Sequence, residues 1–235
     1  MKKNSVVICD VYRTLLNVFP APRNAETVWR ELGEEVFGKP LGCSLEEFSL
    51  KCESVIKEDH QTARVAGIAY PEVDWSSVIA RVLPEGQKLT QGVLADFVFR
   101  HMQLLRTLEL MPGAVEFLNE CLQQSIPLGI ASNAQAYTLR ELGEALAGEG
   151  LSLAVFAKDL TFWSFEHGFS KPDPHVFRLL AARLACRGVE TSRALMVGDR
   201  EDNDIRPAFA QGFRTWKLSS AEDTNWQALF RDCFH

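Results

Sequence analysis

The run Ser5-Val6-Val7-Ile8-Cys9 is almost wholly apolar and ends abruptly at Asp10. Two later runs end in the same way: Ile126 to Ala131 stops at Ser132-Asn133, and Ala194 to Val197 stops at Gly198-Asp199. Short apolar runs bounded by turn residues are typical of strands buried on both faces of a parallel sheet. Ligands bind beyond the carboxyl ends of such strands. The sequence therefore predicts an enzyme whose site lies at one edge of the sheet.

Beyond Met111 the chain alternates between helical and strand-like segments. The predicted helices are Pro112–Gln124, Gln135–Leu146, Pro174–Cys186, near Asp204–Ala210 and near Asn225–Phe230; the predicted strands are Pro127–Ala131, around Leu153–Phe156, Ala194–Val197 and Phe213–Lys217. Alternation of this kind indicates parallel strands joined by right-handed helical crossovers. We therefore expect an α/β core made of residues 1–16 and 110–235.

The segment from about Asn24 to Arg106 has a different pattern, because helical periodicity and capping signals replace the strand-like runs. The expected helices are Asn24–Gly38 with Asn24 as its cap, one opened by a capping box at Ser44-Leu45-Glu46-Glu47, Pro71–Leu83, and Thr90–Arg106. Residues 17–109 are therefore predicted to be an all-helical insertion directly after the first strand of the core.

The composition is that of an ordinary globular protein, with 235 residues, 46% of them hydrophobic, and a formal net charge of −6. This charge gives no reason to expect nucleic acid as a partner, whereas a local cation would still allow a small anionic substrate. The six cysteines are scattered without metal-ligand spacing, which favours a reduced cytoplasm. The apolar stretch after Met1-Lys2-Lys3 is too short for a signal peptide or a membrane span, so no membrane partner is expected.

The polar residues at the strand ends suggest nucleophilic attack on phosphorus or on an activated carbon. Asp10 is a candidate nucleophile, since a carboxylate can form a covalent intermediate that water later cleaves; a turn aspartate that bonds backbone amides is the alternative. Thr14 can orient Asp10 through its hydroxyl. Ser132 and Asn133 can bind the oxygen atoms of an anionic group, although a helix cap explains the pair equally well. Lys171, in Ser170-Lys171-Pro172-Asp173-Pro174, can neutralise charge on the nucleophile and the substrate.

The densest acidic cluster, Asp199, Asp202 and Asp204, follows a predicted buried strand. Hard divalent cations such as Mg²⁺ take oxygen ligands of this kind, although a helix N-terminus also favours acidic residues through its dipole. If Asp10 and Asp199 converge, two like charges with one lysine would force one pKa upward. A bound Mg²⁺ ion would resolve this conflict.

Four ordered motifs in this chain resemble those of the haloacid dehalogenase-like hydrolase superfamily. They are Asp10-Val11-Tyr12-Arg13-Thr14-Leu15, Ala131-Ser132-Asn133, Glu166 to Pro174, and Val197-Gly198-Asp199 through Asp204. The resemblance covers essentially the whole chain and implies a Rossmann-like core with the insertion as a helical-bundle cap. It implies Asp10 as nucleophile, Ser132 as a binder of substrate oxygen and Lys171 as the stabilising cation. It also implies Asp199 as a Mg²⁺ ligand supported by Asp204.

The first motif departs from the phosphatases of this superfamily, which carry a second aspartate as general acid where this chain has Tyr12. The backbone carbonyl of Tyr12 can still bind the metal as that position does in the family, and its side chain can contact substrate. Tyrosine resembles the dehalogenases proper, whose water-activating aspartate matches Asp202 in spacing. Those enzymes, however, lack the metal and have asparagine at the position of Asp199. Arg30 is only faintly similar to their halide-binding arginine.

The metal motif decides the interpretation, because loss of a general acid slows an enzyme by about 10²- to 10⁴-fold without removing its metal site. We therefore expect a magnesium-dependent phosphatase that acts on a small phosphorylated metabolite through an aspartyl-phosphate intermediate. Two alternatives stay open: metal-independent dehalogenation of a 2-haloacid, and a catalytically degenerate member that only binds a ligand. The sequence assigns no role to Arg13 and indicates no oligomeric state.

Overall fold

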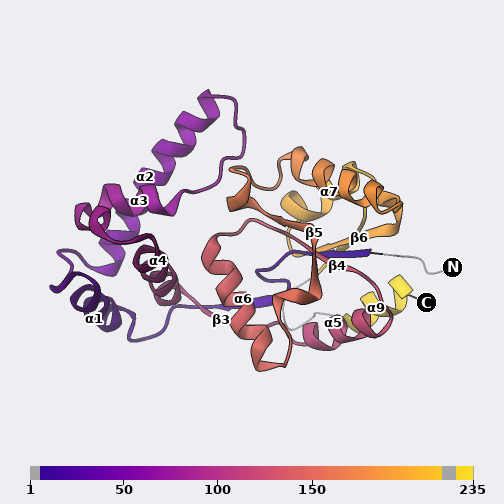
Figure 1. Cartoon of the computed structure of the whole chain (residues 1–235), viewed down its shortest axis with the longest axis horizontal. Coiled ribbons are helices and arrows are strands. Elements are labelled where there is room, and N and C mark those ends of the chain that lie inside the picture. The colour runs from indigo at the N-terminus through magenta and orange to yellow at the C-terminus, as the bar shows by residue number, and fades with distance from the viewer. Residues whose placement is uncertain (1–5, 219–225, 235) are drawn as a thin grey trace. The chain divides into compact units, whose positions relative to one another are not determined.

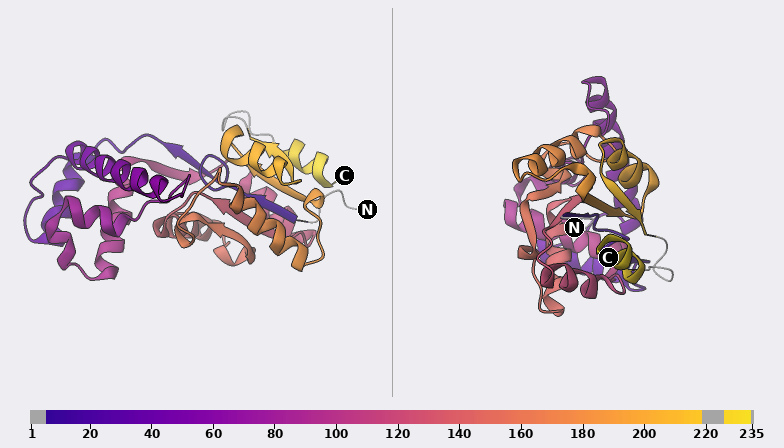
Figure 2. Two further views of the ribbon diagram at one scale, coloured as in Figure 1. Left: turned by 90° about the horizontal axis from the view of Figure 1, so that it is seen from above. Right: turned by 90° about the vertical axis from the view of Figure 1, so that its right-hand side faces the viewer.

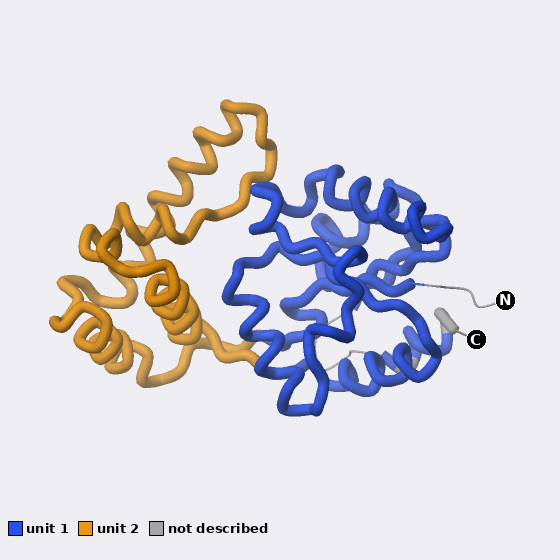
Figure 3. The backbone as a smooth tube through the Cα atoms, viewed as in Figure 1, with its two compact units in different colours: residues 1–17, 109–235 blue, residues 18–108 orange. Residues whose placement is uncertain are grey.

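The structure, a computed structural model, describes residues 6–218 and 226–234; Ser5, Met1-Lys2-Lys3 and Asn225 lie outside this description. The chain divides into two compact units (Figure 3). The core unit comprises Met1–Asn17 and Glu109–His235, and the helical unit comprises Val18–Leu108. None of the helices in the described ranges is both long and apolar enough to cross a bilayer.

A five-stranded sheet forms the centre of the core unit, with the strand order β5-β4-β1-β6-β7 (Figure 1). Its strands are β1 (Val6–Cys9), β4 (Leu128–Ser132), β5 (Phe156–Trp163), β6 (Ala194–Gly198) and β7 (Arg214–Lys217). Every adjacent pair is parallel. The predicted α/β class with a Rossmann-like parallel sheet is confirmed.

Helices cover both faces of this sheet (Figures 1 and 2). They are α5 (Ala114–Gln123), α6 (Ala136–Gly148), α7 (Pro174–Cys186), α8 (Arg206–Ala210) and α9 (Trp226–Phe234). The double cover explains the continuous apolar runs of the sequence, since every residue of β1, β4 and β6 is buried. On the side of α7 the core is apolar throughout, with Phe162, Phe177 and Phe213 among its buried side chains.

One expected strand of the core unit was wrong in position, and the helix expected near Asp204–Ala210 differs by two residues at its start. A strand was expected around Leu153–Phe156, but residues 153–155 form a 3₁₀ turn and β5 begins at Phe156. The exposed Lys158 and Asp159 lie in this edge strand and interrupt its apolar pattern. The helix expected from Asp204 begins at Arg206 instead, after a π-helical turn over Glu201–Ile205.

The helical unit contains α1 (Ala25–Phe37), α2 (Leu45–Val65), α3 (Trp75–Val82) and α4 (Gln91–Leu105). The capping box at Ser44 is confirmed, since its hydroxyl accepts from Glu47 N while the Glu47 carboxylate accepts from Ser44 N. The predicted side-chain cap at Asn24 is wrong, because that side chain makes no capping bond. The helix expected from Pro71 begins only at Trp75, where the side chain of Asp74 accepts from Ser77 N.

The insertion is not wholly helical. Strands β2 (Leu16–Phe19) and β3 (Thr107–Leu110) form a separate two-stranded sheet, and the division between the two units falls within both strands. Each strand has only four residues and is partly exposed, so neither has the apolar pattern by which buried strands are recognised.

Candidate active site

The first two acidic residues of the site follow neighbouring strands. Strands β1 and β6 are in parallel register from Val6↔Ala194 to Cys9↔Val197, so Asp10 and Asp199 follow them at the same edge of the sheet. Asp10 N donates to Val197 O at 2.9 Å, which ties the nucleophile candidate to the adjacent strand. Since β4 and β5 extend the sheet on one side of β1 and β6 and β7 on the other, this edge is the topological switch point at which α/β sheets bind ligands.

The π-helical turn places Asp204 against the end of β6. Its side chain is completely buried, and its Oδ2 accepts from Arg200 N at 3.0 Å. A Cβ atom at Gly198 would lie 2.5 Å from Cγ of Asp204, so only glycine leaves room for this carboxylate. Both residues of the Gly198-Asp199 pair therefore serve the site. Gly198 leaves room for the carboxylate of Asp204, and Asp199 contributes a carboxylate of its own.

Lys171 joins the acids that follow different strands. It is 3% exposed, and its Nζ donates to Oδ1 of Asp10 at 2.8 Å and to Oδ1 of Asp204. Asn133 fixes the backbone of Lys171 from both sides: Nδ2 of Asn133 donates to Lys171 O at 2.8 Å, and Lys171 N donates to Asn133 Oδ1 at 2.7 Å. One amide hydrogen of Asn133 remains for a ligand.

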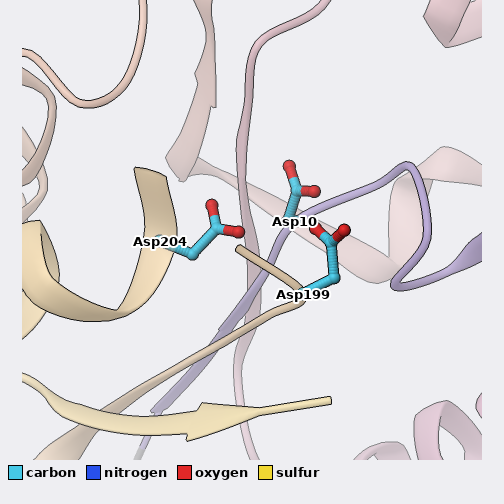
Figure 4. Close-up of side chains that lie close together, drawn as sticks. All are labelled: Asp10, Asp199 and Asp204. Carbon is cyan, nitrogen blue, oxygen red and sulfur yellow. The ribbon is translucent and has the colours of Figure 1, made fainter. Parts of the chain in front are cut away.

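Carboxylate oxygens of Asp10, Asp199 and Asp204 all lie within 4.8 Å of one another (Figure 4). Burial raises the pKa of Asp10 to about 6; Lys171 opposes this rise, and Asp204 and Asp199 add to it. Burial, then the charge of Asp204, also raises the pKa of Asp199, while Lys171 and Arg13 act against the rise. Burial lowers the pKa of Lys171, but the two carboxylates it contacts raise it more, so its pKa lies above the ordinary value.

These three carboxylates fit a divalent cation. One ammonium group faces three acids. The pKa values of Asp10 and Asp199 are raised first by burial and then by the neighbouring carboxylates, so the cluster carries more negative charge than Lys171 balances. A hard cation bound by carboxylate oxygens would remove that surplus. The donor set contains oxygen only, which suits Mg²⁺ better than a metal that prefers nitrogen or sulfur ligands.

The carboxylates open into a pocket of about 450 Å³ that belongs wholly to the core unit. Its lining residues are Asp10, Tyr12, Arg13, Asn133, Lys171, Asp199, Arg200, Asn203 and Asp204. Ser132 and Thr14, two further residues predicted for the site, are completely buried. Neither hydroxyl has a hydrogen-bond partner within the described part of the chain, and neither residue is among those that line the pocket.

Tyr12 lines the pocket, but its hydroxyl bonds to helix α6. It donates to Glu141 Oε2 and lies 2.8 Å from Thr138 Oγ1. Thr138 and Glu141 are both buried and were missed by the sequence reasoning. The available signal was the placement of two polar residues three positions apart on the apolar face of a predicted helix, but nothing in the sequence links that face to Tyr12.

Asp202 does not belong to the acidic cluster. It is exposed and is held by Arg200, whose Nε and Nη2 donate to it at 3.1 and 2.6 Å. It is absent from the pocket lining, whereas the other two acids of the same motif are present. Arg30 belongs to the helical unit, where it is exposed.

Comparison with known proteins gives three results. A sequence model described as haloacid dehalogenase-like hydrolase matches residues 5–212. Phosphoserine phosphatase from Thermus thermophilus is 35% identical over 121 residues, which are 52% of this chain and 44% of that protein. Ribulose-1,5-bisphosphate 5-phosphatase from Halopiger xanaduensis is 34% identical over 121 residues, 52% of this chain and 47% of that protein. The chain thus matches less than half the length of each of these curated relatives.

Among solved structures, the HAD family enzyme BT-2542 from Bacteroides thetaiotaomicron matches with a TM-score of 0.63 and 14% identity, over 98% of this chain and all of that one. The same enzyme has also been solved in complex with magnesium and inorganic phosphate (TM-score 0.59, 14% identity, 97% and 100% covered). A 2-haloacid dehalogenase from Pseudomonas syringae matches with a TM-score of 0.58 and 22% identity, over 92% and 86% of the two chains. At these identities the likeness is one of fold.

Proposed function

Because this chain belongs to the haloacid dehalogenase-like hydrolases, whose family model covers residues 5–212, we propose that it is a magnesium-dependent phosphatase of a small phosphorylated metabolite. One observation carries the proposal: three carboxylates within 4.8 Å of one another, two of them bonded to the buried Lys171. Two further facts support it. The curated relatives are named as phosphatases, and a structural neighbour was solved with magnesium and phosphate.

In this proposal Mg²⁺ would be held by Asp10, Asp199 and Asp204, together with the backbone carbonyl of Tyr12. The bound ion would supply positive charge to the phosphoryl oxygens and to the crowded carboxylates. The raised pKa of Asp10 supports this assignment, since burial and its two acidic neighbours disfavour the anion that a nucleophile needs. The ion would lower that pKa and keep Asp10 ionised near neutral pH.

The first chemical step forms a bond between Asp10 and phosphorus. Lys171 holds Oδ1 of Asp10, which leaves Oδ2 to attack while the bond from phosphorus to the leaving oxygen breaks and its electron pair goes to that oxygen. The ammonium group of Lys171 stabilises the charge that develops on the transferring group. In this proposal the remaining amide hydrogen of Asn133 binds a phosphoryl oxygen. The buried hydroxyls of Ser132 and Thr14, which bond to no described residue, are proposed to bond to a phosphoryl oxygen and to Asp10 once substrate is bound.

The second step releases phosphate. Water attacks phosphorus and gives up a proton to bulk water, while the bond from phosphorus to Asp10 breaks and its electron pair returns to the carboxylate. No acid side chain takes part in this scheme, because the Tyr12 hydroxyl donates to Glu141 and so cannot protonate a leaving oxygen at the same time. The leaving group therefore takes its proton from water. Substrates whose leaving groups depart as stable anions, such as acyl and aryl phosphates, should react faster than alkyl phosphates.

We further propose that the helical unit, residues 17–109 in the predicted boundaries, is a cap domain that selects the substrate. A cytoplasmic location is likewise part of the proposal. Five cysteines, Cys9, Cys43, Cys52, Cys121 and Cys186, are free thiols in the structure, which is compatible with a reducing compartment.

The test is phosphate release from acetyl phosphate and 4-nitrophenyl phosphate, with Mg²⁺ and with excess EDTA. The proposal expects turnover with Mg²⁺, loss of turnover with EDTA, and recovery when Mg²⁺ is restored. A folded protein that releases no phosphate from either compound in the presence of Mg²⁺ would overturn it.

Dehalogenation of a 2-haloacid is the second candidate, favoured by Tyr12. The position of Asp202 counts against it, since this residue is exposed and bonded to Arg200, outside the pocket of Asp10. Halide release from 2-chloropropionate that persists in EDTA, without phosphate release from the two phosphate compounds, would favour dehalogenation.

A further inference from the structure

Arg13 adopts a backbone conformation that side chains rarely accept. Its φ is 57°, in the left-handed region where a Cβ atom is strained and glycine is the usual residue. Among the described residues only Ser125 shares this property without being glycine. Ser125 follows the end of α5, where a left-handed residue commonly closes a helix. Arg13 closes no helix and lies in the turn after the nucleophile, so its conformation needs another explanation.

The turn itself dictates this conformation, whatever side chain it carries. Arg13 N donates to Leu16 O at 2.6 Å, and the amides of Thr14 and Leu16 donate to Val11 O at 3.3 and 2.8 Å. A glycine would make the same backbone bonds without strain. Strained residues of this kind persist mostly where a side chain has a task, and they are concentrated at ligand sites.

Arg13 differs from the other basic residues of the pocket in having no partner. Lys171 is bonded to Asp10 and Asp204, and Arg200 is bonded to Asp202. The guanidinium of Arg13 forms no hydrogen bond or ion pair with any residue that the structure describes. Arg13 is exposed to solvent, whereas Lys171 is buried. The two cations line the same pocket, one at its solvent-exposed part and the other in its interior.

The charges of the pocket assign the two cations to different groups. Lys171 and a divalent ion suffice for the phosphoryl group that Asp10 attacks. Arg13 adds a further positive charge: it acts on the pKa of Asp199 through space but forms no hydrogen bond or ion pair with any described residue, so its guanidinium can still bind another anion. A guanidinium forms paired hydrogen bonds with a carboxylate or a phosphate, and such bonds are among the stronger ones in proteins.

We propose that Arg13 binds a second anionic group of the substrate, a carboxylate or a second phosphate, while the transferable phosphoryl group lies between Asp10 and Lys171. This inference rests on the proposed phosphatase function and narrows its substrate class to phosphate esters that carry another anion. It makes Arg13 a specificity-determining residue of the core unit.

Binding of stable substrate analogues to the whole protein in Mg²⁺ tests this proposal. The probes are methyl, ethyl and propyl phosphonate, the same chains ending in a carboxylate, and alkane bisphosphonates of equal length. Titration calorimetry gives the ratio of dissociation constants between each plain phosphonate and its partner with a second anion. Wild-type protein should bind the best doubly anionic analogue about 10- to 100-fold more tightly, the contribution expected of charge-assisted hydrogen bonds. The carboxylate and bisphosphonate series together identify which anion Arg13 prefers.

Four variants sharpen the measurement. Arg13→Gly fits the left-handed backbone and should fold well, yet it should bring the ratio down to about one, and Arg13→Gln should do the same. Arg178→Gln removes an equally exposed arginine from α7, outside the pocket lining, and should keep the wild-type ratio. Arg13→Lys retains the charge without the paired geometry and should give an intermediate ratio.

A wild-type ratio near one in both series, or a ratio that survives Arg13→Gly, overturns the proposal, as does the absence of any phosphonate binding. The outcome is separable from that of the proposed function. A protein that shows the ratio but hydrolyses no aryl phosphate keeps the Arg13 site and loses the phosphatase assignment. A protein that hydrolyses aryl phosphate without the ratio keeps the phosphatase assignment and loses the Arg13 site.

Discussion

The core unit and the helical unit bury their polar side chains in opposite ways. In the core unit the ammonium group of Lys171 is bonded to two carboxylates, all three residues being under 10% exposed. In the helical unit His101 is 1% exposed among the rings of Trp29, Phe48 and Trp75. Neither of its ring nitrogens has a hydrogen-bond partner in the part of the chain that is described.

This difference separates a site from a packing position. Buried charges remain ionised only when partners compensate them, and the core unit brings three segments of the chain together to do so. Burial without a partner instead keeps a histidine neutral, and it lowers the pKa of His101 to about 4. We therefore expect perturbation of the core cluster to affect catalysis, and perturbation of His101 to affect only the stability of its own unit.

The largest effect should follow from Asp10→Asn. An amide cannot attack phosphorus, so kcat for 4-nitrophenyl phosphate should fall by at least about 10⁴-fold. The fold should survive, because Lys171 keeps its bond to Asp204. Asp159→Asn is the matched control: this exposed carboxylate pairs with Arg187, neither residue lines the pocket, and the substitution should leave kcat within about twofold. Activity of the Asp10 variant above one per cent of wild type would exclude Asp10 as nucleophile.

Lys171→Met should cause the largest loss of stability. It leaves the buried carboxylates of Asp10 and Asp204 without their cation, which typically destabilises a protein by about 3 to 5 kcal/mol. Urea unfolding in EDTA measures this loss, and added Mg²⁺ should recover part of it. Lys39→Met, which breaks the exposed pair with Glu85, should have a much smaller effect. Equal effects of the two substitutions would show that the core cluster is not energetically special.

His101 should make the helical unit sensitive to acid. Its pKa is 6.5 in the unfolded chain and about 4 in the folded one, so its contribution is complete above pH 6.5 and is lost as pH falls toward 4. This amounts to about 2 kcal/mol between pH 8 and pH 5. Hydrogen exchange of amides in α1 and α4, compared with those in β1 and β6, measures the loss by unit. His101→Phe should remove it; a loss that persists in this variant would assign the sensitivity to other groups.

The sequence could predict the polar cluster of the core unit because the fold repeats one rule. Parallel strands that are buried on both faces are apolar to their ends. The polar residue that follows each apolar run therefore lies at the same edge of the sheet. Asp10 and Asp199 were found in this way, and the structure brings them together with Lys171 and Asp204. The bonds from Tyr12 to Thr138 and Glu141 join residues more than 120 positions apart, and no local pattern records such a contact.

Edge strands and helix starts were predicted less well, for physical reasons that the structure makes plain. In β5 the exposed side chains of Lys158 and Asp159 lie where the register with β4 shifts between Leu128 and Ile130, so the apolar period of the strand is broken. Gly129 of β4 lies so close to the Leu160 carbonyl of that strand that a Cβ would collide with it. The glycine is visible in the sequence, but nothing in the sequence shows that Leu160 of another strand lies against it.

The smallest predicted effect tests what local sequence can determine inside the helical unit. Ser44 and Asn24 look alike as caps in the sequence, but only the side chain of Ser44 bonds to its helix. Ser44→Ala should therefore lower the free energy of unfolding of the helical unit by about 1 kcal/mol, whereas Asn24→Ala should change it by only a few tenths. Hydrogen exchange in the first turns of α2 and α1 measures the two effects separately. If the two substitutions proved equally costly, capping in this unit would follow residue type rather than the bonds observed. Such a result would mean that the hydrogen bonds seen in the structure do not explain stability in the helical unit, whereas they are expected to do so for the Lys171 cluster of the core unit.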